Sequence, residues 1–490
     1  MREGRRRARI CAAGAMLLAI AIAACGLDQT GLAEPPAEGG ALAETGTDVV
    51  RAVDSPSDAP ASDATLADGR ADALADVVVD APREADAFVS TLSPDFVYRD
   101  VNQVLGTGQS LSVGTLGSPV LTTTQPYSNL MFVTGVMAES AGLTSFLPLV
   151  EGDLIPGTGS RVETMSSSFA NLVTKVARNV ILVGQPAGQT SHDLLVSQHG
   201  VGSTTYAGLK KGTAPYATGI AQAQAGHDLA VAAGQSHVVR VVTNVHGETD
   251  SDQNNTAYED NLIEWQSDYE TDVQAITGQA DPIPMLITQF SSWTARTGFP
   301  TTSIIPSAML AAHVDAPGKI VLVGAKYHLP YAADGVHLSN DGYRHMGEDY
   351  AKVYRRVILE GKPWEPIHPK SITRVGAVVT VQMHVPAPPL VLDTALVSNP
   401  GHFGFEWADD GPTPSIVSVA LAGADTVTIT LSATPTGDNP RLRYAFTGAS
   451  GALGGAATGP RGNLRDSDIT PSRNGYALYN WCVHFDVEAP

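Results

Sequence analysis

A serine placed directly after a strand can act as a nucleophile, and the segment Gly108-Gln109-Ser110 offers one. Apolar residues typical of a strand precede the segment, and its glycine permits a tight turn. A serine that begins the next element keeps its own backbone N–H free, and that N–H can stabilise an oxyanion. Ser110 is therefore the candidate nucleophile.

A matching base lies far along the chain, in the segment Asp334-Gly335-Val336-His337. An Asp three residues before a His can reach the imidazole across one turn. The carboxylate then holds the tautomer whose other nitrogen accepts the serine proton. Because the two segments are distant in sequence, only the fold could assemble them.

Other serines and histidines are weaker candidates. The same Gly-Gln-Ser tripeptide recurs at residues 234–236, but before a strand, and we interpret it as structural. Ser112 and Ser203 lack comparable partners. His328 has no Asp three residues before it, and His345 lies within a predicted helix.

The elements that must position these residues alternate between strands and helices. Short apolar runs predict strands at residues 104–105, 194–198, 238–245, 284–289 and 320–324. Amphipathic periodicity predicts helices at residues 217–233, 258–276 and 341–359. This alternation predicts a mostly parallel sheet between helices, with the site at the carboxyl ends of the strands.

The pattern changes after Pro366, where strand-like runs follow one another without helices. They lie at residues 375–385, 403–407, 416–421, 426–431, 442–446 and 477–487. Such a series predicts an antiparallel β-sandwich or jelly roll. Trp407 and Trp481 are candidate sugar-stacking residues, although core packing is the expectation for both. Cys482 is expected to be a buried, unreactive thiol.

The N-terminus has the pattern of a secretory signal. Arginines in residues 1–9 precede an apolar run over residues 10–25, which is shorter than a membrane-spanning helix. The run ends in Ile22-Ala23-Ala24-Cys25, which resembles the bacterial lipobox. That resemblance implies diacylglycerol on the Cys25 sulfur and a lipid anchor in the bacterial cell envelope. The absence of Asp after Cys25 favours the outer membrane or the cell surface.

Residues 26–90 are acidic and rich in Ala and Pro, which predicts a disordered tether between the anchor and the folded domains. The formal net charge of the chain is −20, so nucleic acid is excluded as a partner. The predicted organisation is a signal at 1–25, the tether at 26–90, an α/β domain at 91–366 and a β-domain at 367–490.

Four segments in this order resemble the SGNH or GDSL-like esterases, which have a flavodoxin-like three-layer fold. They are Gly108-Gln109-Ser110, residues 201–205, residues 246–250 and residues 334–338. Within that family the chain is most similar to the carbohydrate acetylesterases related to sialate O-acetylesterases, whose first segment reads Gly-Gln-Ser. The resemblance covers about residues 100–360.

The resemblance implies roles for individual residues. Ser110 would be the nucleophile, His337 the general base and then acid, and Asp334 the residue that orients His337. The N–H groups of Ser110 and Gly202 would form the oxyanion hole. His246 stands where that branch usually has Gln, and we expect its imidazole N–H to be a third donor.

Gln109 and Glu248 are candidate supporting residues of the same site. Glu248 would order the loop of His246 or contact the substrate. His246 and Glu248 lack a third metal ligand at a recognisable spacing, and Asp250-x-Asp252 lacks the glycine and closing Glu of a calcium loop. We therefore expect no metal and no organic cofactor.

The expected reaction is hydrolysis of an ester, and the resemblance implies that the substrate is an O-acetylated carbohydrate. Two alternatives stay open. The chain could be a non-catalytic, glycan-binding surface lipoprotein with a degenerate esterase domain, or a lipase or thioesterase on the same fold. The serine, histidine and aspartate by themselves predict only ester hydrolysis.

Overall fold

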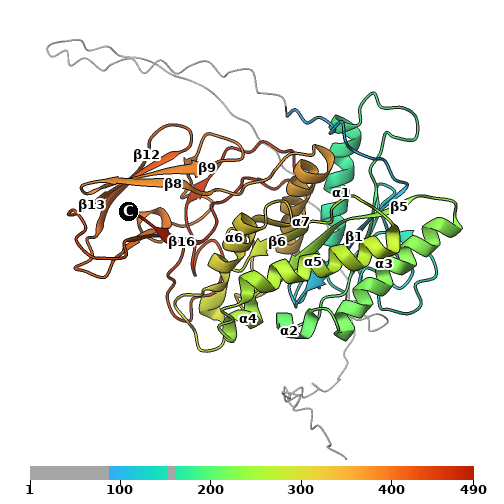
Figure 1. The fold of residues 1–490 in the computed structure, drawn as a ribbon, viewed down its shortest axis with the longest axis horizontal. Coiled ribbons are helices and arrows are strands. Elements are labelled where there is room, and N and C mark those ends of the chain that lie inside the picture. The colour runs from blue at the N-terminus through green and yellow to red at the C-terminus, as the bar shows by residue number, and fades with distance from the viewer. Residues whose placement is uncertain (1–87, 153–160) are drawn as a thin grey trace, which may run out of the picture. The chain divides into compact units, whose positions relative to one another are not determined.

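The structure, a computed structural model, describes residues 88–152 and 161–490 (Figure 1). The predicted signal peptide at 1–25, the lipidation residue Cys25 and nearly all of the predicted tether at 26–90 lie outside the described residues. Within the described ranges, no helix combines the length and the apolar character that crossing a membrane requires.

One sheet forms the centre of the α/β region, with the strand order β3-β2-β4-β1-β5-β6-β7. Its strands are β1 (Val101–Gly108), β2 (Leu130–Phe132), β3 (Phe146–Pro148), β4 (Leu194–Gln198), β5 (His237–Val245), β6 (Met285–Gln289) and β7 (Ile320–Ala325). Strands β2 and β3 pair antiparallel, and every other neighbouring pair in this sheet is parallel. The strands β1, β4, β5, β6 and β7 follow the 2-1-3-4-5 order of flavodoxin-like folds.

Helices cover both faces of this sheet. They are α1 (Ser166–Val176), α2 (Tyr206–Leu209), α3 (Ala214–Ala232), α4 (Glu248–Asp252), α5 (Tyr258–Thr277), α6 (Ile305–Asp315) and α7 (Asn340–Tyr354). Wider π-type turns extend α1 to Ile181 and α7 to Leu359. In Figure 1, α3 and α5 cross one face of the sheet, while α1 and α7 lie together behind it.

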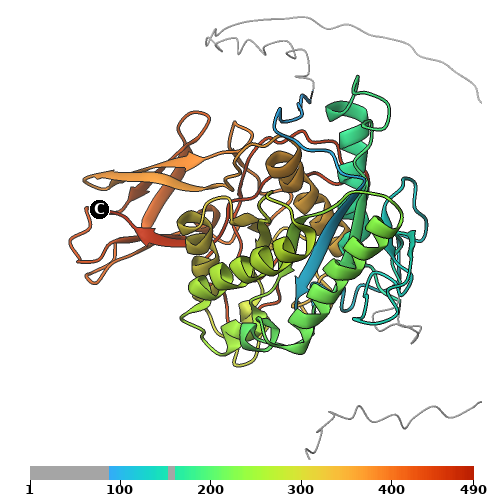
Figure 2. The same ribbon diagram turned by 45° about the vertical axis from the view of Figure 1, so that its right-hand side comes forward.

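Alternation along the strands explains this layering. Met285 and Ile287 of β6 belong to the core under α5 and α6, whereas Leu286 between them belongs to the core under α1 and α7. Successive residues of a strand point to opposite faces, so a run that is apolar throughout must be covered on both. Figure 2 shows the same arrangement after a rotation of 45°.

Local signals set the helix that matters most for the site. Helix α7 begins directly after Ser339, whose hydroxyl accepts a hydrogen bond from the Gly342 N–H at 3.2 Å. This cap satisfies one of the N–H groups that the first helical turn leaves without an intrahelical partner. His337 therefore lies two residues before the capping residue Ser339, which fixes the start of the helix.

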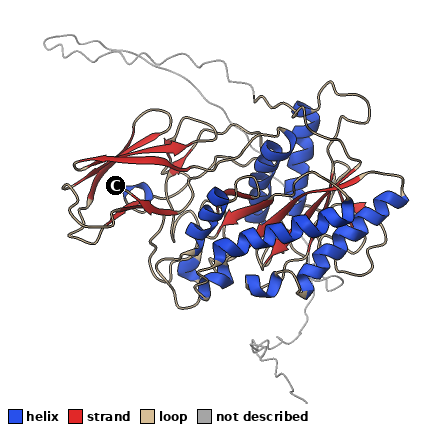
Figure 3. Ribbon diagram, viewed as in Figure 1, coloured by secondary structure: helices blue, strands red, loops and turns tan. Residues whose placement is uncertain are grey.

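Only antiparallel sheets follow residue 366, as Figure 3 shows by the red strands in that region. The strands are β8 (His368–Val375), β9 (Val378–His384), β10 (Val391–Leu392), β11 (Phe405–Ala408), β12 (Ile416–Leu421), β13 (Thr426–Leu431), β14 (Arg441–Tyr444), β15 (Leu464–Arg465) and β16 (Phe485–Glu488). Short 3₁₀ turns lie at Trp293–Ala295 and His402–Gly404. The predicted fold class, a mostly parallel α/β sheet followed by a β-rich region, is confirmed.

Two predicted strands of the β-rich region were wrong in detail. Residues 375–385 are not one strand, because β8 ends at Val375 and the chain turns at Gly376, with φ +62°, into β9. Most of residues 477–487 is irregular, and only its end belongs to β16. Instead of pairing in a sheet, this irregular stretch contacts α7: the Lys352 ammonium donates a hydrogen bond to the Asn480 side chain at 2.8 Å.

The β-rich region and the α/β region share a continuous core. Gln289, at the end of β6, donates to the His484 carbonyl at 2.9 Å and accepts from the His484 N–H at 2.7 Å. All the described residues fall within one compact unit, so the domain boundary at 366 stays a prediction. Cys482, Trp407 and Trp481 are buried in this core, as expected.

Candidate active site

Ser110, His337 and Asp334 form one chain of hydrogen bonds. The Ser110 hydroxyl lies 2.8 Å from Nε2 of His337, and Nδ1 of His337 lies 2.6 Å from Oδ2 of Asp334. The His337 side chain is 17% exposed and that of Asp334 is 37% exposed, so the group is accessible from solvent. A hydroxyl, an imidazole and a carboxylate in this order can move a proton away from the serine oxygen.

The carboxyl end of β1 carries Ser110. Strand β1 lies between β4 and β5, and the loops that follow all three strands meet there. Gly108 has φ +124°, and a Cβ at this position would lie 2.2 Å from the Val245 carbonyl oxygen. Only glycine fits this close approach, which turns the chain sharply and brings the Gln109 N–H to the same oxygen at 3.0 Å.

The loop that carries Asp334 and His337 is closed by its own hydrogen bonds. Oδ1 of Asp334 accepts from the Val336 and His337 N–H groups, each at 3.0 Å, while Oδ2 faces the imidazole. The Ala332 N–H donates to the His337 carbonyl at 2.8 Å. Burial favours a higher pKa for Asp334, but these hydrogen bonds outweigh it and hold the pKa below its usual value. Asp334 is therefore a carboxylate that can pair with an imidazolium.

Two backbone N–H groups beside Ser110 are available to an oxyanion. Neither the Ser110 N–H nor the Gly202 N–H donates a hydrogen bond to any described residue. A Cβ built on Gly202 would lie 3.7 Å from the Ser110 Cβ, so the loop after β4 passes close to the serine. These are the two backbone donors that the sequence analysis predicted.

His246 makes different contacts from those expected of an oxyanion donor. Its Nδ1 lies 2.7 Å from the Tyr258 hydroxyl, and its Nε2 lies 3.0 Å from the Thr204 carbonyl oxygen. Because the carbonyl can only accept, Nε2 carries the proton and Nδ1 accepts from Tyr258. Burial lowers the pKa of His246, which keeps this neutral form. Both nitrogens are thus engaged by the protein, and the structure does not present His246 to Ser110.

Gln109 and Glu248 contact one another beneath the serine. The Gln109 amide donates to Oε2 of Glu248 at 2.9 Å, and the Lys326 ammonium donates to Oε1 at 2.8 Å. All three side chains are buried. Burial favours a higher pKa for Glu248, but Lys326 more than compensates, so the pKa lies below its usual value. The buried ion pair holds the residue adjacent to the nucleophile.

Lys326 was missed by the sequence analysis. The sequence did contain a sign of its role, because Lys326 directly follows the apolar run of β7. A lysine buried there would need a partner of opposite charge. What the sequence does not show is that β5 and β7, which Glu248 and Lys326 closely follow in the chain, are separated only by β6.

Two of the weaker serine candidates, Ser112 and Ser236, have other partners. The Ser112 hydroxyl donates to the Gln109 carbonyl at 2.7 Å and therefore holds the turn around the nucleophile. Ser236, in the second Gly-Gln-Ser tripeptide, bonds to Asp100 at the amino ends of β5 and β1. That position is the opposite edge of the sheet, which confirms its structural interpretation.

A loop from the β-rich region reaches the same edge of the site. The Gly454 N–H donates to the Gly335 carbonyl at 2.9 Å. Gly335, between Asp334 and His337, has φ +64°, and a Cβ there would lie 2.5 Å from the Leu453 Cβ. The β-rich region therefore supports the loop of the base, which the sequence did not indicate.

Comparisons with known proteins give only distant structural neighbours. No protein-family model matches the chain, and no curated protein matches it. Among solved structures, a carbohydrate acetylesterase from Xanthomonas citri is similar at 14% identity and TM-score 0.49, covering 79% of this chain and 80% of its own. A protein from Arabidopsis thaliana shares 16% identity over 52% of this chain and 98% of its own, with TM-score 0.37. An aryl esterase from M. smegmatis shares 12% sequence identity over 52% of this chain and 99% of its own, with TM-score 0.28. Identities and TM-scores this low do not assign a function, so the function must be inferred from the geometry of the site.

Proposed function

We propose that the protein is a serine esterase that removes O-acetyl groups from carbohydrates. The observation that carries the esterase activity is the hydrogen-bonded chain of Ser110, His337 and Asp334 at the carboxyl edge of the sheet. The carbohydrate substrate rests on the resemblance of the four sequence segments to the carbohydrate acetylesterases.

In the proposed reaction, the Ser110 oxygen attacks the acetyl carbonyl while Nε2 of His337 takes the serine proton. The N–H groups of Ser110 and Gly202 stabilise the oxyanion that forms. His337 then returns the proton to the oxygen of the leaving sugar, which leaves acetyl-Ser110. Water, deprotonated by His337, attacks this ester and releases acetate.

His246 has a supporting role in this proposal. Its Nε2–H holds the Thr204 carbonyl, in the loop that carries Gly202. His246 thus stands at the sequence position where the resembled family has a side-chain oxyanion donor. In this chain its imidazole hydrogen-bonds to the backbone of the loop that carries Gly202 instead. The proposed oxyanion hole therefore consists of two backbone donors.

The decisive experiment is an esterase assay on the full chain with nitrophenyl acetate, followed by acetate release from acetylated polysaccharides. Wild type should hydrolyse both, and Ser110→Ala neither. If wild type is inactive and Ser110→Ala binds glycan as well as wild type, the protein is a glycan-binding module. Preference for octanoyl over acetyl esters would instead identify a lipase or thioesterase.

We also propose that Cys25 is lipidated and anchors the protein in the bacterial cell envelope, with residues 26–90 as the tether. Mass spectrometry of the protein from membranes of an expressing bacterium tests this directly. Cys25→Ala should lose the lipid mass and appear in the soluble fraction. An unchanged membrane fraction for Cys25→Ala would contradict the anchor.

A further inference from the structure

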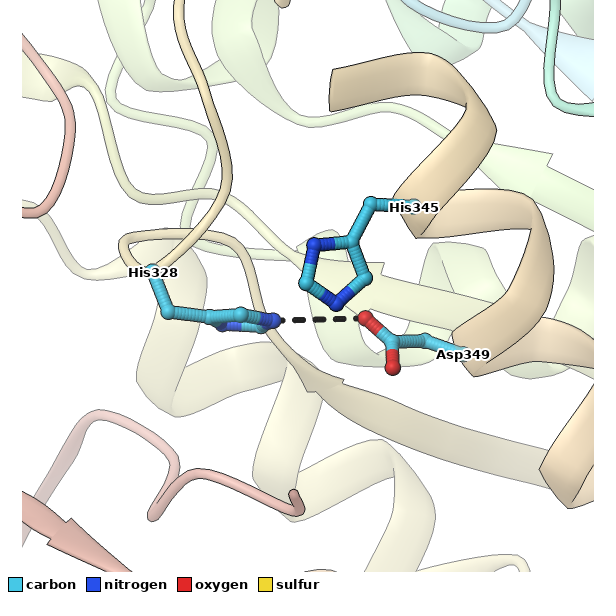
Figure 4. A group of neighbouring side chains, drawn as sticks. All are labelled: His328, His345 and Asp349. Carbon is cyan, nitrogen blue, oxygen red and sulfur yellow. Dashed lines mark hydrogen bonds and ion pairs between the residues drawn. The ribbon is translucent and has the colours of Figure 1, made fainter. Parts of the chain in front are cut away.

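A second group of imidazole and carboxylate side chains lies beside α7, apart from the proposed active site (Figure 4). We call His328, His345 and Asp349 the α7 cluster. His328 follows β7, whereas His345 and Asp349 stand four residues apart on α7 and so share one face of that helix. One ligand atom of each side chain lies within 4.8 Å of the other two.

The α7 cluster is buried and incompletely hydrogen-bonded. The His328 and Asp349 side chains are only 8% and 12% exposed, and Nε2 of His328 lies 3.3 Å from Oδ2 of Asp349. Nε2 of His345 is buried without a partner among the described residues. Figure 4 shows both rings turned toward the carboxylate. A buried polar atom without a partner costs free energy, which a ligand between the three side chains would recover.

The protonation states of the cluster are those of metal ligands. Burial lowers the pKa of His345 to about 4, so its ring is neutral at pH 7. Burial favours a higher pKa for Asp349, but Lys352 and the imidazoles lower it to about 2. Neutral imidazole and ionised carboxylate are the forms that bind metals.

The ammonium group of Lys352 also lies near Asp349, but beside Oδ1, whereas His328 contacts Oδ2. Its ammonium is 3.6 Å from Oδ1 of Asp349 and equally 3.6 Å from Oδ2 of Asp468. It also donates to the Asn480 side chain at 2.8 Å. Lys352 is thus shared among several acceptors of the C-terminal segment, and Oδ2 of Asp349 is left to the two histidines.

One pair of ligand atoms in the cluster has the spacing of ligands on a small transition-metal ion. Two ligand atoms on a tetrahedral zinc, each about 2.0–2.1 Å from the metal, are about 3.3 Å apart. The His328 and Asp349 atoms are 3.3 Å apart. A cavity of about 20 Å³, lined in part by His328, Asp349, Thr288 and Asn480, adjoins them. That volume admits one water molecule, which would complete four-fold coordination.

We propose that His328, His345 and Asp349 bind one Zn²⁺ ion, with a water molecule as fourth ligand, and that this ion clamps the loop of the active site. His328 precedes the segment 329–344, which holds Asp334 and His337, and His345 follows it. The ion therefore joins both ends of the loop that carries the base. Two imidazoles and one carboxylate favour zinc over calcium or magnesium, which prefer oxygen ligands.

Aromatic residues of the C-terminal segment enclose the site. Tyr476 stacks on His345 with ring centroids 4.6 Å apart, and Trp481 stacks on His328 at 5.8 Å. Such a shell fixes the orientation of the ligand rings and limits access of solvent. The same stacking attaches the C-terminal segment to the cluster.

Another histidine and carboxylate group, formed by Glu365, His368 and His384, provides the matched control. The Glu365 side chain is 44% exposed and lies 3.1 Å from Nε2 of His368 and 3.2 Å from Nε2 of His313. Its carboxylate is therefore already shared between two imidazoles, and a solvent-exposed group gains less from a bound ion.

The test uses the full chain, stripped with EDTA and titrated with ZnCl₂, with bound zinc measured by atomic emission. We expect about one tightly bound zinc per chain and a higher thermal midpoint after zinc addition. His345→Gln and Asp349→Asn should weaken zinc binding at least about tenfold, whereas His384→Ala should bind zinc as wild type does. Cobalt in place of zinc should give visible absorption in wild type and lose it in His345→Gln.

Folded wild type that binds no zinc overturns the proposal without recourse to any variant. Zinc binding that His384→Ala abolishes and His345→Gln retains overturns it as well, because the ion then lies at the other group. Hydrogen exchange tests the clamp separately. Zinc should slow exchange over residues 329–344, and zinc binding with unchanged exchange there would rule out the clamp.

Discussion

Two pairs of aspartate and histidine lie in one short stretch of chain, with Asp334 and His337 between His328 and Asp349, and the pairs differ in burial and in their third partner. His337 and Asp334 are 17% and 37% exposed, and the imidazole faces the Ser110 hydroxyl. His328 and Asp349 are 8% and 12% exposed, and their carboxylate is approached by a second imidazole. Because the first pair faces a hydroxyl that can give up a proton, we propose His337 as a base. Because the second pair faces Nε2 of His345, which is unpartnered among the described residues, we propose that His328 and Asp349 are metal ligands.

The comparison shows that residue type alone does not assign a role to histidine. The first pair is local, since its members stand three residues apart, and it can be seen in the sequence. The members of the second pair stand 21 residues apart. The additional imidazole, His345, lies on the same face of α7 as Asp349. The following predictions test the difference, beginning with the largest effect.

Ser110→Ala should lower kcat for nitrophenyl acetate by at least about 10⁴-fold, because it removes the attacking oxygen. Ser236→Ala is the matched control, since it changes the same Gly-Gln-Ser tripeptide at the opposite edge of the sheet. Its kcat should equal that of wild type. An active Ser110→Ala enzyme would place the chemistry elsewhere in the molecule.

Asp334→Asn should lower kcat by about 10³–10⁴-fold, since the amide neither fixes the His337 tautomer nor stabilises the imidazolium. The double variant Ser110→Ala, Asp334→Asn should be no slower than Ser110→Ala, because both residues serve one proton transfer. Zinc binding by Asp334→Asn should match wild type. An additive loss in the double variant would show that Asp334 acts independently of the serine.

Glu248→Gln should destabilise the fold by about 3–5 kcal/mol at pH 7, because it leaves the Lys326 ammonium buried without a counter-charge. The pKa of Glu248 is lower in the folded chain than in the unfolded chain. Its contribution is therefore complete above about pH 4 and declines as the pH falls through the folded pKa.

Urea unfolding of wild type and Glu248→Gln at several pH values measures this. The gap between the two free energies of unfolding should narrow below about pH 4. A gap that widens toward low pH would mean that Glu248 is protonated in the folded protein.

Gly335→Ala should cost about 1–3 kcal/mol, from backbone strain at φ +64° and from contact of the new Cβ with Leu453. Gly234→Ala is the matched control, because Gly234 has φ +70° with open space around its Cβ position. Its cost should be smaller, since only strain contributes. Equal urea midpoints for the two variants would show that the Leu453 contact carries no energy.

Much of the fold could be predicted because local patterns report burial directly. The strand at residues 194–198 was predicted with its observed bounds, since an apolar run ends there in a polar turn. Helix α6 was missed because it is apolar nearly all round, which gives no amphipathic period. The irregular stretch over residues 477–484 was mistaken for a strand because its apolar residues pack on α7 and the core rather than in a sheet.

The candidate site divides in the same way. Ser110, Asp334 and His337 could be found from local geometry, because each lies in a turn directly after a strand or before a helix. The role expected for His246 did not follow, since its contacts come from Tyr258 and the Thr204 carbonyl on other elements. Lys326 could be seen as a buried charge only after the sheet order was known.

By itself, the sequence determined the α/β and β-rich regions and indicated Ser110, Asp334 and His337 as candidates, because hydrophobic periodicity and turn residues are local patterns. The tertiary structure decided what each histidine faces: a serine hydroxyl for His337, a backbone carbonyl for His246, and a carboxylate beside a second imidazole for His328. The physical reason is that an imidazole acts according to the atom facing each nitrogen, and those atoms come from strands and helices that only folding brings together.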